Sequence, residues 1–86
     1  MENEKDWRLE TWNGGHTWYD NKNNIRKIHY YNENTVFYYD ENRKLHRADG
    51  PAAECFDVKK WFYHGECIEC NSQEELERIL KLKAFW

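Results

Sequence analysis

The fold is decided by the stretch WYDNKNNI at residues 18–25, which recurs as YYDENRKL at residues 38–45 and, more loosely, as WFYHGECI at residues 61–68. Each copy begins with aromatic residues, continues through a polar turn and ends on an aliphatic residue. Aromatic residues favour strands, and Asn, Asp and Gly tolerate the backbone conformations of tight turns. Each copy therefore predicts strand, turn and strand, and the chain reads as a tandem repeat of β-hairpins.

Further turn signals divide the rest of the chain into short segments. They lie at Asn13-Gly14-Gly15, Asn32-Glu33-Asn34 and Ala48-Asp49-Gly50-Pro51. The strands predicted between these turns cover residues 6–12, 16–20, 25–31, 35–40 and 52–56. With the last copy of the repeat, the sequence predicts about six or seven short strands in an antiparallel meander. Because one hairpin cannot bury its own apolar face, neighbouring hairpins must stack.

The end of the chain changes to a helical period. Ser72 and Glu75 have the spacing of a capping box, in which each side chain bonds the other residue's backbone N–H. Apolar residues then recur at helical spacing, namely Leu76, Ile79, Leu80, Leu82 and Trp86. Acidic residues stand early and basic residues late, which suits the helix dipole. We expect an amphipathic helix at residues 72–84 that closes the hairpins, and an α+β fold class.

The composition fits one small domain with an aromatic core. The chain has 86 residues, of which five are Trp, six Tyr and four Phe. A chain of this length buries only about 60–65% of its unfolded surface, so large residues must supply much of the stability. We expect a single domain over residues 1–86, with degenerate hairpin units at 1–34, recognisable repeats at 35–70 and the helix at 72–84.

Charge and cysteine usage exclude several classes of protein. The net charge of −3 comes from acidic and basic residues spread along the chain, without the basic stripe of a duplex-DNA binder. No apolar run approaches the roughly 20 residues that span a membrane, and the polar stretch MENEKD at residues 1–6 is unlike a secretory signal. Three cysteines without an export signal predict reduced thiols in a cytoplasm.

The stretch YYDENRKLHRADGPA at residues 38–52 resembles a repeat found in many small bacteriophage and large-virus proteins. Its pattern is Leu-His-Arg-x-Asp-Gly-Pro-Ala, and it is similar to a divergent MORN-type β-hairpin repeat. The stretch KWFYHG at residues 60–65 matches the turn of the next unit, with His64 where Asn is usual, and LKLKAFW at residues 80–86 resembles the closing helix of such phage proteins. The resemblance covers residues 35–86 and implies a viral origin, a hairpin-repeat scaffold and no known catalytic motif. With the cysteine usage, we expect the protein in the host cytoplasm.

Four residues could in principle hold zinc, namely Cys55, His64, Cys67 and Cys70. Cys67 and Cys70 are expected in the last strand, where positions three apart face opposite sides and cannot reach one metal ion. A redox pair would need its first thiol at a helix N-terminus. The sequence favours small, partly buried thiols, and we expect no metal and no cofactor.

The histidines do not predict an active site. His16, His29, His46 and His64 lie at similar phases of the repeat, but no nucleophile or carboxylate pair converges on any of them. We expect His46 and Arg47 to bond the backbone near the Asp-Gly-Pro turn, and His29 to bond backbone in the same way. That turn lacks the glycines and the lysine of a phosphate loop. We therefore expect a protein that is not an enzyme.

Aromatic residues alternate so that both faces of the sheet carry them. One face must be core, and the other is either covered or exposed. An exposed aromatic patch would mark a partner site, whereas rings lying on the sheet could simply stabilise cross-strand pairs. Both interpretations stay open at this stage. The residues predicted to bind a partner are Tyr30, Tyr38 and Trp61.

Together these observations predict a phage-encoded, non-enzymatic module that binds a host or phage protein, with inhibition of a host factor or a host defence system as its role. A second hypothesis is a small-molecule or nucleotide binder, in which aromatic residues stack a base while Arg26, Arg43 or Arg47 meets a phosphate. A third is a structural virion protein or homo-oligomer, because repeat units leave unpaired sheet edges.

Overall fold

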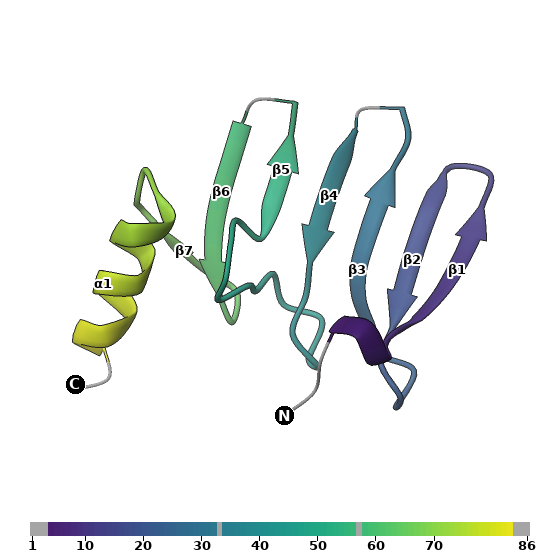
Figure 1. The fold of residues 1–86 in the computed structure, drawn as a ribbon, viewed down its shortest axis with the longest axis horizontal. Helices are drawn as coiled ribbons and strands as arrows, with labels where there is room; N and C mark the ends of the chain where they lie inside the picture. Colours follow the sequence, from purple (N-terminus) through teal and green to yellow (C-terminus); the bar gives the residue numbers. More distant parts are fainter. Residues whose placement is uncertain (1–3, 33, 57, 84–86) are drawn as a thin grey trace.

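The described residues form seven antiparallel strands followed by a C-terminal α-helix, which confirms the predicted α+β meander (Figure 1). The computed structural model describes residues 4–32, 34–56 and 58–83. The strands pair in chain order and are β1 (Arg8–Trp12), β2 (Gly15–Tyr19), β3 (Ile25–Tyr30), β4 (Thr35–Tyr38), β5 (Ala53–Cys55), β6 (Val58–Tyr63) and β7 (Glu66–Ile68). A 3-10 helix, η1 (Glu4–Asp6), precedes the sheet, and α1 (Gln73–Lys83) follows it.

The first two copies of the repeat form the same turn. In each, a buried Asp carboxylate accepts hydrogen bonds from the backbone N–H groups two and four residues later. The distances are 2.9 and 2.9 Å at Asp20, and 2.8 and 3.0 Å at Asp40. The residue three positions after the Asp has a positive φ in both copies, 64° at Asn23 and 63° at Arg43. The repeat seen in the sequence is therefore a structural repeat as well.

The third copy turns differently. His64 and Gly65 form a two-residue loop between β6 and β7, and both have positive φ, 48° and 88°. Positive φ at both positions defines a type I′ hairpin turn, which matches the twist of the flanking strands.

The strand expected after the second turn is absent. Leu45 makes an isolated bridge with Tyr39, and the chain then crosses to β5. The crossing contains Pro51, which has no N–H to donate to a sheet. It also contains Gly50, where an added Cβ would lie 2.7 Å from the Arg47 guanidinium. The Asp-Gly-Pro element therefore replaces a strand with a packed loop.

The two faces of the sheet differ in what covers them. Residues directly opposite each other on neighbouring strands point to the same face. Trp61 lies opposite Ile68, and both pack with Leu76 of α1 into the core cluster. Figure 1 shows α1 beside β7, at one end of the sheet. We call this the helix-side face, and the opposite one, which carries Trp12 and Tyr30, the aromatic face.

Residues 72–83 confirm the predicted helix within the described part of the chain, while residues 84–86 lie outside it. The Ser72 hydroxyl accepts a hydrogen bond from the Glu75 N–H over 3.2 Å, as a capping box requires. The Glu75 carboxylate accepts its bond from the N–H of Asn71 rather than from that of Ser72. One half of the predicted capping box is thus formed, and the other is shifted by one residue.

Candidate functional site

A row of aromatic rings crosses the sheet on the aromatic face. Trp12 on β1 meets Tyr30 on β3 edge to face, with ring centroids 5.8 Å apart. Tyr30 meets Phe37 on β4 in the same way at 6.1 Å, and Phe37 lies 6.5 Å from Tyr39. The register explains the row, because Trp12, Gly15 and Tyr30 are directly opposite one another on three neighbouring strands. Gly15 has no side chain, so the rings on either side of it can approach.

The outer end of this row faces solvent. Trp12 is 43% exposed and Tyr30 is 37% exposed. The Trp12 indole N–H donates a hydrogen bond of 2.9 Å to the hydroxyl of Thr17, which orients the indole across the sheet. A Cβ on Gly14 would lie 2.3 Å from the indole, so the glycine leaves room for it. The local sequence therefore places a large apolar ring in a defined position at the surface.

A small apolar hollow adjoins the inner end of the row. Its volume is about 190 Å³, and Ile25, Ile28, Tyr39 and Arg43 line it. Burial raises the pKa of Tyr39, and the neighbouring Tyr30 raises it further. The phenol of Tyr39 therefore stays uncharged at neutral pH. The hollow could accept an apolar group, with the Arg43 cation beside it.

Of the three residues predicted to bind a partner, Tyr30 lies on the aromatic face and the other two do not. Tyr38 is 9% exposed and lies beneath the Arg47 guanidinium, 4.0 Å from its ring centroid, with the Lys27 ammonium at 4.9 Å. Trp61 is 7% exposed, packs under α1 and donates its indole N–H to Gln73. Both are packing residues, and the structure does not bring them together with Tyr30.

Trp12 and Phe37 belong to the aromatic row but were not among the predicted partner-binding residues. The signal that could have found Trp12 was the hairpin at Asn13-Gly14, which pairs it with Gly15. Alternation alone placed Phe37 on the face opposite Tyr38. Neither pattern could show that Tyr30 lies on the same face of the sheet as Trp12 and Phe37.

Two of the arginines considered for phosphate binding are engaged within the fold. The Arg26 guanidinium donates to the Tyr39 carbonyl over 2.9 Å and lies 3.4 Å from the Asp20 carboxylate. Arg47 donates to the Asp49 carboxylate over 3.0 Å and to the Pro51 carbonyl. The prediction for Arg47 near the Asp-Gly-Pro turn is therefore confirmed. Arg26 and Arg47 serve the scaffold in this structure.

The second and third turns are tied together by a carboxylate and two histidines. His64 Nδ1 lies 2.8 Å from Asp40 Oδ2, and the His64 ring stacks on that of His46 with centroids 4.0 Å apart. His46 Nδ1 accepts a hydrogen bond from the backbone N–H of His64, so His46 bonds the next hairpin turn and not the Asp-Gly-Pro turn as predicted. His29 also differs from its prediction, because it bonds the side chain of Asn34 rather than backbone.

These contacts set the protonation of the cluster. Burial alone would raise the pKa of Asp40, but hydrogen bonds from His64 and from two backbone N–H groups lower it below the ordinary value. Burial lowers the pKa of His46, and the adjacent His64 lowers it further. Asp40 is thus a carboxylate and His46 a neutral acceptor at neutral pH. The arrangement suits a structural link between repeat units.

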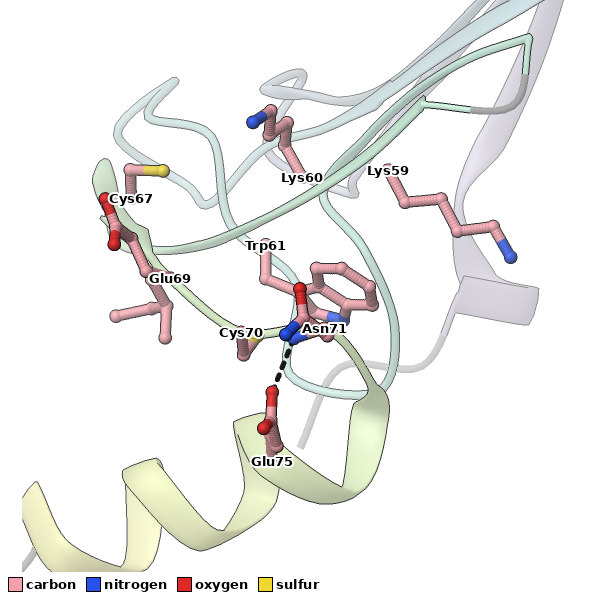
Figure 2. Close-up of a pocket in the computed structure, with 9 residues that line it drawn as sticks. Lys59, Lys60, Trp61, Cys67, Glu69, Cys70, Asn71 and Glu75 are labelled. Atoms are coloured by element: carbon pink, nitrogen blue, oxygen red, sulfur yellow. Dashed lines mark hydrogen bonds between the residues drawn. The ribbon is translucent and has the colours of Figure 1, made fainter.

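A wider hollow lies between β6, β7 and the start of α1 (Figure 2). Its volume is about 660 Å³, and Trp61 forms part of its wall. Figure 2 shows Lys59 and Lys60 leaving β6 in different directions, with Glu75 near the first turn of α1. Charges of both signs thus line the hollow.

Cys70, beside this hollow, is unlike a reactive cysteine. Burial raises the pKa of Cys70, and Glu75 raises it further, so Cys70 is a thiol at neutral pH. Cys67 lies in β7 as expected, but Cys70 lies two residues beyond its end, so the prediction that both lie in the last strand is wrong for Cys70. Cys55 lies in β5. Within the described part of the chain, no three side chains of His, Cys, Asp or Glu gather to hold a metal ion.

Comparisons with protein-family models, curated proteins and solved structures find no match to this chain. No described helix has the length and apolar character that crossing a membrane requires. The interpretation of the site therefore depends on its geometry.

Proposed function

We propose that the protein is a non-enzymatic binding module and that a partner protein docks on the aromatic face. The observation that carries this proposal is the row of Trp12, Tyr30 and Phe37, on the face opposite the core that α1 covers. Large aromatic side chains dominate the binding energy of protein interfaces, because they bury much area at a low entropic cost. All three rings are already held in place by ring contacts within the sheet.

The charges on this face favour an acidic partner surface. Lys60 lies opposite Ala53, which lies opposite Phe37, so the lysine borders the aromatic row. Arg43 lies at the hollow beside Tyr39. Cations on this face would attract an acidic partner even though the whole chain carries a net charge of −3.

The resemblance of residues 35–86 to repeats of phage and large-virus proteins supports a host protein as the partner, in the host cytoplasm. The role that fits a small module without catalytic groups is inhibition of a host factor or of a host defence system. Blocking a surface needs contact area rather than chemistry.

Tyr30 and Tyr31 provide a matched pair for the test. They are neighbours of the same type, and both are exposed. Tyr30 belongs to the aromatic row, whereas the Tyr31 hydroxyl lies 3.0 Å from His16 Nε2 on the other face. Any difference between their alanine variants therefore reports on the face and not on the residue type.

Tagged wild type, Tyr30→Ala and Tyr31→Ala would be purified from host cells, and the proteins that accompany them would be identified by mass spectrometry. We expect one stoichiometric protein with the wild type and with Tyr31→Ala, and its loss with Tyr30→Ala. If Tyr30→Ala still retained the specific protein, the binding site would lie outside the aromatic face. Wild type that purifies alone would contradict the proposed function.

A further inference from the structure

Strand β1 is an open edge of the sheet. It pairs with β2, and among the described residues no other strand lies beside it. All five of its residues are exposed. Figure 1 shows β1 at the end of the sheet farthest from α1. An edge strand of this kind presents unpaired backbone groups to which another strand can add.

The hairpin geometry defines which backbone groups face outward. The Gly14 carbonyl accepts a hydrogen bond from Tyr31, so Gly14 directs its carbonyl towards β3. Because backbone direction alternates along a strand, Gly15 and Thr17 direct their groups towards β1, where they are opposite Trp12 and Glu10. The remaining positions of β1, Leu9 and Thr11, therefore direct their N–H and C=O groups towards the open edge.

We propose that the protein forms a two-fold dimer in which β1 pairs antiparallel with β1 of a second copy, centred on Leu9. In this register the two Leu9 residues exchange backbone hydrogen bonds. Arg8 of each copy then lies opposite Glu10 of the other, which gives two pairs of opposite charges. The register centred on Thr11 would place Glu10 opposite Trp12 and gives no such pairs. Charge complementarity thus favours a second copy of the chain as the partner of β1, and it selects the register centred on Leu9.

The exposure of these side chains supports the pairing. Leu9 is half exposed, so meeting a second Leu9 would remove apolar surface from water. Arg8 and Glu10 are 3.9 Å apart within the strand, and both side chains are more than half exposed. Their present ion pair is therefore weak. Arg8 also donates a hydrogen bond of 3.0 Å to the Asn23 side chain and lies 4.9 Å from the Tyr19 ring centroid, so pairing with the second copy would exchange these exposed contacts for an ion pair with Glu10.

The dimer would also enlarge the aromatic face. Antiparallel strands related by a two-fold axis perpendicular to a sheet present the same face on the same side. Trp12 stands at the β1 end of the aromatic row. In the register centred on Leu9, the Trp12 residues of the two copies lie on opposite sides of the two-fold axis, so the joined sheet carries two separate rows on one face. Such a surface could engage two partner sites at once, which strengthens binding by avidity. The dimer itself does not depend on the proposed function.

Charge reversal tests the register directly. Sedimentation of the full chain would be followed from about 10 μM to about 1 mM, because a short edge interface lies at the small end of the range for protein contacts. We expect the wild type to dimerise within this range. Arg8→Glu and Glu10→Arg should each weaken dimerisation by about tenfold or more, because each change turns two attractive pairs into repulsive ones.

Mixing the two single variants provides the decisive control. The Arg8→Glu variant carries two acidic residues on β1 and the Glu10→Arg variant two basic ones, so an equimolar mixture should form heterodimers more readily than either variant forms homodimers. The double variant Arg8→Glu/Glu10→Arg should dimerise like the wild type. Wild type that stays monomeric throughout, or single reversals that leave association unchanged, would overturn the proposal.

Discussion

The two ends of the sheet are built from the same kind of hairpin, but they use their apolar residues differently. At the β6–β7 end, Trp61 and Ile68 are buried under Leu76 of α1. At the β1 end, Leu9 and Trp12 are exposed. A helix of 11 residues covers one end only. The C-terminal end therefore contains a helix-covered core, while the N-terminal end leaves apolar side chains exposed.

The turns show the same contrast. The second carboxylate oxygen of Asp20 meets Asn24 and Arg26 of its own unit. The second oxygen of Asp40 meets His64 of the following unit. The Asp20 carboxylate thus bonds within its own unit, whereas the Asp40 carboxylate links the second unit to the third. Substitutions at the two ends should therefore differ in their effect on stability.

The largest loss of stability is expected from Leu76→Ala. Leu76 is fully buried in the core cluster, so its truncation should lower the free energy of unfolding by about 2–5 kcal/mol. Leu82→Ala is the matched control, because Leu82 lies on the same helix with 57% of its surface exposed. Urea unfolding should show Leu82→Ala within about 0.5 kcal/mol of the wild type. Equal effects of the two variants would mean that α1 does not close the core.

An intermediate effect is expected from acidification. In the folded protein the pKa of His46 lies below its ordinary value of 6.5. As the pH falls, His46 of the unfolded chain is therefore protonated before His46 of the folded chain. The stability that His46 contributes above pH 6.5 is lost as the pH falls through its folded-state pKa. The pKa values of Asp20 and Asp40 are likewise below 3.8. The contribution of these two carboxylates to stability is present above pH 3.8 and is lost as the pH falls through their folded-state pKa values.

Urea unfolding at a series of pH values would measure both losses. Asp40→Asn should be less stable than the wild type at neutral pH, and its stability should fall less steeply in the acid range. A variant that keeps the full acid dependence would show that the link between Asp40 and His64 contributes nothing to stability.

The sequence predicted the elements of this fold because their signals are local. Turn residues at Asp20 and Asp40, aromatic alternation and the Ser72 cap each act within a few residues, and each is found in the structure. The strand expected at Leu45 is wrong, because residues 44–47 make only scattered backbone hydrogen bonds to the neighbouring segments and an isolated bridge instead of a regular ladder.

Which face is covered could not be predicted from the sequence, because it depends on where α1 docks. Tyr38 and Trp61 begin successive copies of the repeat, and both are buried in packing contacts. Tyr30 lies outside the repeat motif, on the opposite face. The long-range register that joins Tyr30 to Trp12 and Phe37 carries no local signature. The candidate site was therefore only partly predictable.

A much smaller loss of stability than that of Leu76→Ala is expected from Trp12→Ala. Trp12 is partly exposed, and its truncation removes one hydrogen bond to Thr17, so the free energy of unfolding should fall by about 1 kcal/mol. The midpoint of thermal unfolding of this variant should lie close to that of the wild type and far above that of Leu76→Ala. A loss as large as that of Leu76→Ala would make Trp12 a core residue and remove it from the docking surface.

The most direct test of the aromatic face is to map the captured partner onto isotope-labelled protein by NMR. We expect the signals of the Trp12 indole N–H and of the backbone N–H groups of Tyr30 and Phe37 to shift or broaden on addition of the partner. The backbone N–H signals of Leu76 and Ile79 in α1 should stay in place. Perturbations confined to α1 and the hollow between β6, β7 and α1, with an unchanged aromatic row, would contradict the proposed docking on the aromatic face.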